Sequence, residues 1–115
     1  MVHTQQSAFD AAYRGVVAQG GYHAAVFRHR QLGTRCALGH LIDDDTADRW
    51  QHNYALAEDI PRSALDAVGL GDLSYTFLYR LQKAHDSSIP GNVDDFKARM
   101  TNVAREFNLT IPTLA

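Results

Sequence analysis

Hydrophobic residues recur at helical spacing in two long segments, one near each end of the chain. In the first, Gln5–Ala18, apolar side chains return every three or four residues, and Gly20-Gly21 follows as a stop signal. In the second, Asn92 stands as a cap before an apolar stripe with the period of a helix. The stripe consists of Phe96, Met100, Val103 and Phe107. Both segments are predicted to be amphipathic helices, each with one buried face.

Two shorter helices are predicted between them. Asp59 is the expected cap of a helix over Arg62–Val68, because Pro61 stands near its first turn, where proline is tolerated. Leu73–Ala84 has a second apolar repeat, and Ser74 is its expected cap. This second helix is predicted to be mostly buried.

The segment Arg35–Asp45 combines an apolar repeat with reactive residue types. A helix capped by Thr34 would place Leu38, Leu41 and Ile42 on one face. The other face would then carry Cys36, His40 and Asp43. We expect the C-terminal helix to pack on the apolar face. The following residues, Thr46–Ala57, are also predicted to be helical.

A change of period marks the region before this segment. Tyr22–Arg30 alternates between two sets of side chains and is rich in β-branched and aromatic residues, as is typical of a strand. After a turn, residues 34–36 would return as a short second strand. The predicted fold class is therefore α+β, mostly α: a compact bundle of about five or six short helices with a small β-hairpin near residues 22–36. No repeat or linker divides it, so residues 1–115 are predicted to form one globular domain.

The order Cys36, Leu38, Gly39, Leu41 and Asp43 is similar to the Cys-Cys-Leu-Gly-Val-Leu-Cys-Asp-Leu stretch of a family of small bacteriophage and prophage proteins without an assigned activity. The later blocks of that family correspond to Ile60-Pro61, Gly69-Leu70, Leu81 to Asp86, and Asp95 to Met100. Here Ala37, His40 and Ile42 replace Cys, Val and Cys, and His85 replaces Asn. The resemblance covers about residues 33–107 and implies a phage or prophage accessory protein in the bacterial host cell.

Composition fits a folded, soluble chain. Hydrophobic residues make up 45% of the 115 residues and charged residues 21%, which is typical of one globular domain. The single cysteine excludes an intramolecular disulfide and suits a reducing cytoplasm. The N-terminus has no signal-peptide pattern, and no apolar run is long enough to span a membrane. A cytoplasmic location is expected, without membrane association.

Cys36 is the candidate nucleophile. At a helix start beside Arg35 its thiolate would be favoured, and His40, one turn along the same face, could serve as the base of a cysteine-dependent hydrolase or transferase. Side chains one helical turn apart seldom align as nucleophile and base, so His23, His52 or His85, brought in by the fold, are the preferred partners. The structural alternative is a small buried side chain, and we favour it because the adjacent Ala37 suits close packing. His85 and Asp86 are adjacent in a predicted helix, where neighbouring side chains point about 100° apart, so they are not expected to meet.

A metal site would use His40 with Asp43 or Asp44, because a helical face could bring imidazole and carboxylate ligands together. The chain has no paired His-x-x-x-His or Cys-x-x-Cys motif, so no metal and no other cofactor is expected.

Basic residues are concentrated before the acidic run. Arg28, Arg30 and Arg35 could contact a nucleic acid, but Asp43–Asp45 follows at once and limits a positive surface. A nucleic-acid-associated protein is therefore an alternative function.

The number of aromatic side chains favours a partner. The chain has more amphipathic aromatics than one small core requires, and such residues are enriched at the centres of interfaces. They are Tyr22, Trp50, Tyr54, Tyr75 and Tyr79. The preferred function is a protein-interaction module without catalysis, which binds and modulates a host factor or associates with itself. Its candidate binding residues are Trp50, Tyr54, Tyr75, Tyr79, Arg28 and Arg30.

Overall fold

The computed structural model describes residues 2–22, 27–29, 31–50 and 57–113. In these residues all regular structure is helical. The α-helices are α1 (Gln5–Ala18), α2 (Asp44–Trp50), α3 (Arg62–Ala67), α4 (Tyr75–Asp86) and α5 (Val93–Phe107). Two short 3₁₀ helices are η1 (Leu38–Leu41) and η2 (Ala57–Asp59).

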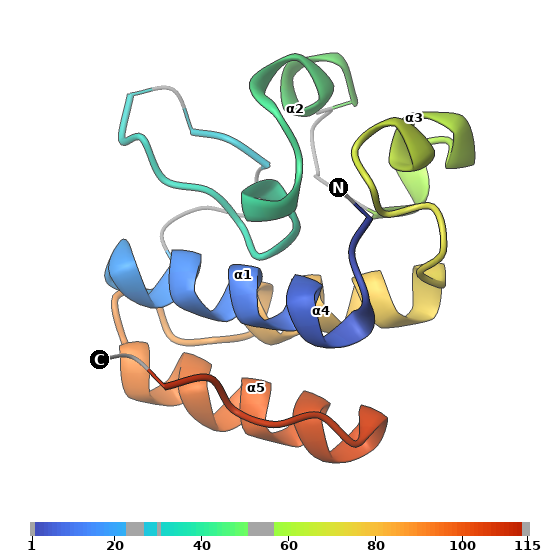
Figure 1. Ribbon diagram of the computed structural model, residues 1–115. Helices are drawn as coiled ribbons and strands as arrows, with labels where there is room; N and C mark the ends of the chain where they lie inside the picture. The colour runs from blue at the N-terminus through green and yellow to red at the C-terminus, as the bar shows by residue number, and fades with distance from the viewer. Residues whose placement is uncertain (1, 23–26, 30, 51–56, 114–115) are drawn as a thin grey trace.

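The helices α1 and α4 form the middle of the molecule (Figure 1). On one side α5 packs against both of them, and on the other side η1 lies against both (Figure 1). The apolar faces of these elements meet in one core, where Phe9, Phe77 and Phe96 are fully buried. The two helices of the middle layer are therefore covered on both sides.

The long helices follow the sequence pattern closely. Helix α1 has the predicted bounds and ends at Gly20 and Gly21, whose φ angles of 88° and 96° are readily adopted by glycine. The predicted caps Ser74 and Asn92 are confirmed, because their side-chain oxygens accept the N–H groups of Phe77 and Asp95. The predicted cap of α3 is wrong: Pro61, and not Asp59, precedes its first residue.

The predicted β-hairpin is wrong in the described part of the chain. Residues 27–29 and 31–36 contain turns and irregular backbone but no strand, while 23–26 and 30 lie outside the described residues. The amide of Gln19 provides a physical reason: its Oε1 accepts the N–H of Arg35 at 2.9 Å and its Nε2 donates to the carbonyl of Arg35 at 2.6 Å. The side chain that follows the end of α1 thus binds both backbone groups of Arg35 that a strand partner would have bound. The fold class is corrected to all-helical for the described residues.

The predicted helix over residues 34–45 is also wrong. Only η1 forms, and the backbone becomes extended at Ile42, with φ −122° and ψ 157°. Asp43 then accepts the N–H of Thr46 at 2.8 Å and caps α2, which begins earlier than predicted. The rest of the predicted helix Thr46–Ala57 falls mostly on 51–56, outside the described residues.

Burial of the predicted apolar stripe is confirmed, because Leu38, Leu41 and Ile42 are all buried. Its predicted partner is wrong. Helix α5 packs on α4 and α1, on the side of these helices away from η1 (Figure 1). The stripe is covered instead by α1 and α4, because both present apolar faces on that side as well.

Phe96 anchors α5 in this arrangement. Its ring is fully buried and its centroid lies 6.1 Å from that of Tyr13 on α1. We expect Phe96→Ala to lower the free energy of unfolding by about 3–5 kcal/mol, because it removes a large buried side chain and leaves a cavity. Denaturant unfolding measures the change; the exposed Ile89, at 56% exposure, provides a control as Ile89→Ala with little expected loss. An unchanged unfolding midpoint for Phe96→Ala would contradict the packing described.

Candidate functional site

Three candidate residues come from two neighbouring elements. Cys36 and His40 lie in residues 36–40, which include most of η1 and which we call the 36–40 turn, and His85 lies in α4; η1 contacts both α1 and α4. His23 and His52 lie outside the described residues. Their surroundings determine whether they can react.

Cys36 is fully buried, and burial raises the pKa of its thiol to about 12. The N–H of Gly39, 3.3 Å from Sγ, opposes this effect only in part. At neutral pH the thiol is therefore protonated. Position 36 provides a small packed side chain, and its environment opposes the thiolate that nucleophilic catalysis needs.

His40 is held against α1. Its Nε2 lies 2.9 Å from Oε1 of Gln19, so this nitrogen carries the proton, and a Cβ at Gly15 would lie 2.5 Å from the ring. Burial first, and then the charges of Arg35 and His85, lower the pKa of His40 to about 4. The ring is therefore neutral over the physiological pH range and acts as a hydrogen-bond donor within the structure.

His85 is fully buried near the end of α4. Its Nδ1 lies 2.7 Å from Oδ1 of Asp86, and its ring centroid lies 4.8 Å from that of Tyr22. The expectation that His85 and Asp86 could not meet is wrong. Asp86 is the last residue of α4, and no helical turn follows it. Its carboxylate can therefore reach the imidazole of His85. Nε2 of His85 is buried without a hydrogen-bond partner among the described residues.

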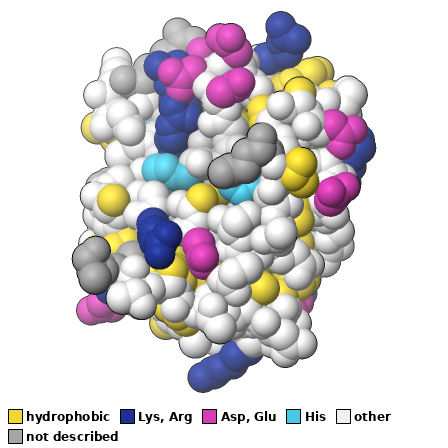
Figure 2. Space-filling model, viewed as in Figure 1, with side chains coloured by type: hydrophobic (Ala, Val, Ile, Leu, Met, Phe, Trp, Pro, Cys, Tyr) yellow, Lys and Arg dark blue, Asp and Glu magenta, His cyan; other side chains and the backbone are white. Residues whose placement is uncertain are grey.

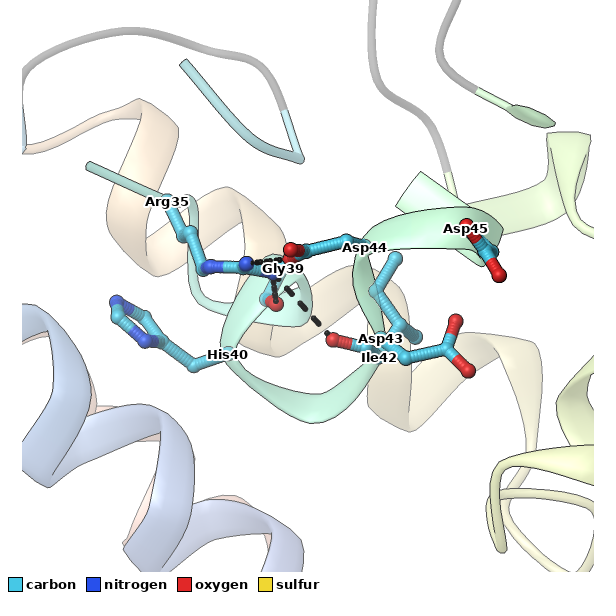
Figure 3. Close-up of a pocket in the computed structure, with 7 residues that line it drawn as sticks. All are labelled: Arg35, Gly39, His40, Ile42, Asp43, Asp44 and Asp45. Carbon is cyan, nitrogen blue, oxygen red and sulfur yellow. Dashed lines mark hydrogen bonds and ion pairs between the residues drawn. The ribbon is translucent and has the colours of Figure 1, made fainter. Parts of the chain in front are cut away.

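A surface hollow of about 510 Å³ is lined by His40, Arg35 and the acidic run Asp43–Asp45. Figure 3 shows Arg35 between the carboxylate of Asp44 and the carbonyl groups of Gly39 and Ile42. The hydrogen bond from Arg35 holds the pKa of the Asp44 carboxyl below its ordinary value. The positive charge of Arg35 is thus compensated within the protein.

The candidate metal ligands do not converge. The imidazole of His40 faces α1, Asp43 caps α2 and Asp44 binds Arg35, while Asp43 and Asp45 point away from Arg35 in Figure 3. Hydrogen bonds from Thr46 lower the pKa of Asp43. In the described part of the chain no three His, Cys, Asp or Glu side chains form a group suited to a metal ion.

The described arginines that were candidates for nucleic-acid binding form ion pairs with carboxylates. Arg28 binds Asp48 at 3.1 Å and lies 3.6 Å from Asp44, and Arg30 lies outside the described residues. Figure 2 shows acidic side chains beside basic ones at the end of the molecule that carries α2. A uniformly positive surface is not formed there, because each described arginine of the trio has an acidic neighbour.

The candidate aromatic residues are distributed over several faces. Trp50 is half-buried against the core, and Tyr54 lies outside the described residues. Tyr75 is used internally: its hydroxyl donates to the carbonyl of Ile60 at 2.6 Å, and Arg62 stacks 4.4 Å from its ring centroid. Tyr79 differs, because 41% of its side chain is exposed.

Two glutamines, one in α1 and one directly after it, bind backbone groups that are far away in the sequence. Sequence reasoning did not predict these contacts. Gln19 binds Arg35, and Gln6 binds Thr110 through both its amide oxygen and its amide nitrogen. Neither glutamine belongs to a sequence motif, and the residues that they bind are 16 and 104 positions away along the chain. No local signal could have revealed these contacts.

Comparison with protein-family models, curated proteins and solved structures finds no match to the chain. No helix among the described residues is long and apolar enough to cross a membrane. The resemblance to small phage proteins stays a prediction.

The raised pKa of Cys36 gives a direct test of the thiol. Because the folded value is about 12 and the ordinary value is 9.0, the thiolate fraction near pH 8 should be roughly a thousandfold lower than in the unfolded chain. Labelling by a thiol reagent should therefore be slow in the native protein and complete in denaturant. Fast native labelling near neutral pH would contradict the burial of Cys36.

The lowered pKa of His40 predicts a loss of stability in acid. The folded value is about 4 and the ordinary value 6.5, so this contribution is complete above pH 6.5 and is lost as the pH falls towards 4. At pH 4.5, relative to pH 7.5, the wild-type chain should lose about 2 kcal/mol more than His40→Gln, which cannot take up the proton. Denaturant unfolding at the two pH values measures the difference, and equal losses would show that His40 does not resist protonation.

Proposed function

We propose that the protein is an interaction module that associates with a second copy of itself through the outer side of α4. The exposed ring of Tyr79 carries this proposal. Phe77, Leu78 and Leu81 of the same helix are buried, whereas 41% of Tyr79 is open to solvent. Tyrosine at the centre of a contact contributes a large apolar area together with a hydroxyl group.

The surface around Tyr79 contains a hollow and charged side chains. A hollow of about 400 Å³ lies beside the first turns of α4 and is lined by Glu58, Tyr75, Thr76, Tyr79 and Arg80. On the other side of Tyr79, Nζ of Lys83 lies 5.7 Å from its ring centroid. We call Glu58, Tyr79 and Lys83 the α4 strip. It has an acidic end, an aromatic centre and a basic end.

This order of charges is self-complementary. If two copies place their α4 helices antiparallel across a twofold axis near Tyr79, Glu58 of each copy faces Lys83 of the other. The two tyrosine rings then lie close to the axis, and their burial supplies the apolar part of the contact. Because the strip covers only a few helical turns, the interface belongs to the small and weak class.

The alternative functions have less support. Thiol chemistry at Cys36 is opposed by full burial and a pKa of about 12. Nucleic-acid binding is opposed by the carboxylates that neutralise Arg28 and Arg35. A phage or prophage context is compatible with a self-associating module, but it rests on the sequence resemblance alone.

Charge reversal tests the antiparallel contact. Sedimentation equilibrium of the wild-type chain should show monomers and dimers that depend on concentration. Glu58→Lys alone and Lys83→Glu alone should both be monomeric, because each places like charges opposite one another. An equimolar mixture of the two variants should dimerise again, since every facing pair then has opposite charges.

Two controls locate the contact. Tyr79→Ala should weaken association, whereas Leu32→Ala, which removes a side chain of 60% exposure elsewhere on the surface, should not. A wild-type chain that is monomeric at all concentrations would overturn the proposal. A mixture of charge variants that stays monomeric would exclude the antiparallel arrangement.

A further inference from the structure

A cleft of about 170 Å³ lies between α4 and α5, which run antiparallel (Figure 1). Each helix lines it with side chains at positions i, i+3, i+4 and i+7, the spacing of one helical face. The lining includes two buried apolar side chains, Ala84 of α4 and Val103 of α5. The cleft is therefore built from one face of each helix, and we call it the α4–α5 cleft.

Positive charge predominates in this cleft. Arg80 and Lys83 come from α4 and Arg99 from α5, whereas Glu106 is the one carboxylate among the lining residues. Three positive charges against one negative charge leave a formal excess of two. The cleft thus differs from the surface near α2, where the described arginines have carboxylates as neighbours.

The cations of the cleft keep donors that no group of the protein uses. Nε of Arg99 donates to Oδ2 of Asp95 at 3.1 Å, but its terminal nitrogens form no hydrogen bond among the described residues. Nε of Arg80 lies 3.3 Å from Oε1 of Glu106, yet it is buried and makes no hydrogen bond in the described part of the chain. Two guanidinium groups, one on each helix, therefore have N–H groups available to an acceptor.

Uncharged donors lie in the same cleft. The hydroxyl of Ser87 comes from α4 and the side-chain amide of Asn102 from α5, and both side chains are exposed. Both groups donate hydrogen bonds to anionic oxygens. The lining thus offers charged and neutral donors from two opposite sides.

This arrangement fits a phosphate group better than a carboxylate. A carboxylate is planar and presents two oxygens on one side with a single charge. A phosphate monoester carries up to two negative charges and has three acceptor oxygens that point in different directions. Donors on two facing helices, with an excess of two positive charges, match the phosphate in both charge and geometry.

The volume limits how much of a ligand enters. Pockets for drug-sized molecules measure about 300–1,000 Å³, whereas the α4–α5 cleft measures about 170 Å³. The cleft accommodates a small anion, and any organic group attached to that anion would extend into solvent.

We propose that the α4–α5 cleft is a binding site for a phosphate dianion, either inorganic phosphate or the phosphate group of a small monoester. Arg80 and Arg99 bind its oxygens from the two helices, and Lys83 adds charge at the edge. Lys83 also belongs to the α4 strip, whereas Arg99 does not, so substitution of Arg99 tests this site independently of self-association.

The experiment is a titration of the wild-type chain with inorganic phosphate near pH 8, followed by NMR, with sodium chloride keeping the ionic strength constant. The side-chain signals of Asn102 and Arg99 should shift and saturate. Arg99→Gln should lower the affinity at least about tenfold, because it removes a charge-assisted contact. Its side chain is 42% exposed, so the variant should stay folded. No saturable shift in the wild-type chain would overturn the proposal.

Arg105→Gln is the matched control. Arg105 is exposed in the last turn of the same helix and does not line the cleft, so this variant loses the same charge and should bind as the wild-type chain does. An equal loss of affinity in the two variants would show a response to net charge alone and would overturn the site.

Two further anions test the chemistry of the ligand. Dimethyl phosphate, a diester with one negative charge, should bind at least about tenfold more weakly than inorganic phosphate, and equal affinity would overturn recognition of a dianion. Glycerol phosphate distinguishes the two sources. Affinity similar to that of inorganic phosphate supports a monoester as the ligand, and binding of inorganic phosphate alone supports the free ion.

Discussion

The close approach of the 36–40 turn to its neighbours is the constraint on which the upper half of the molecule depends. A Cβ at Gly39 would lie 1.9 Å from the carbonyl oxygen of Phe27, and a Cβ at Gly15 would overlap the ring of His40. Both positions require glycine for space. Because the turn sits this close, Gln19 can bind the backbone of Arg35 and the side chain of His40 with one amide. These contacts hold a segment whose regular secondary structure is limited to the short η1.

The long helices could be predicted from the sequence because their signals are local. In α1, α4 and α5 the apolar period, the caps and the stop residues all lie within the helix or next to it. The hairpin and the helix over residues 34–45 were wrong for different reasons, one a contact distant in the sequence and one a local cap. Arg35 is bound by Gln19, and Asp43 uses its carboxylate to start a new helix instead of continuing the old one. Neither choice is visible in the period of the local sequence.

In the candidate site, too, the sequence predicts the types of residues present but not the environment that the fold gives them. The sequence offered His40 and His85 as partners of Cys36, and the structure places η1, which carries His40, against α4, which carries His85. Sequence alone could not show that the environment suppresses their reactivity, because burial is a property of the assembled core. Likewise, the acidic run could be recognised, but its pairing with Arg28 and Arg35 depends on how the 27–50 segment folds.

Cys36 and His40 are held inside this protein, whereas Tyr79 and Gln6 present contact groups at its surface. The thiol of Cys36 is fully buried and the imidazole of His40 is packed against α1, and burial disfavours the charged form of both groups. Tyr79 lies at the surface of α4, and the amide of Gln6 binds backbone at the surface of α1. Contact through a tyrosine ring or through backbone hydrogen bonds requires no change of protonation, so neither contact depends on the buried thiol of Cys36 or on the imidazole of His40.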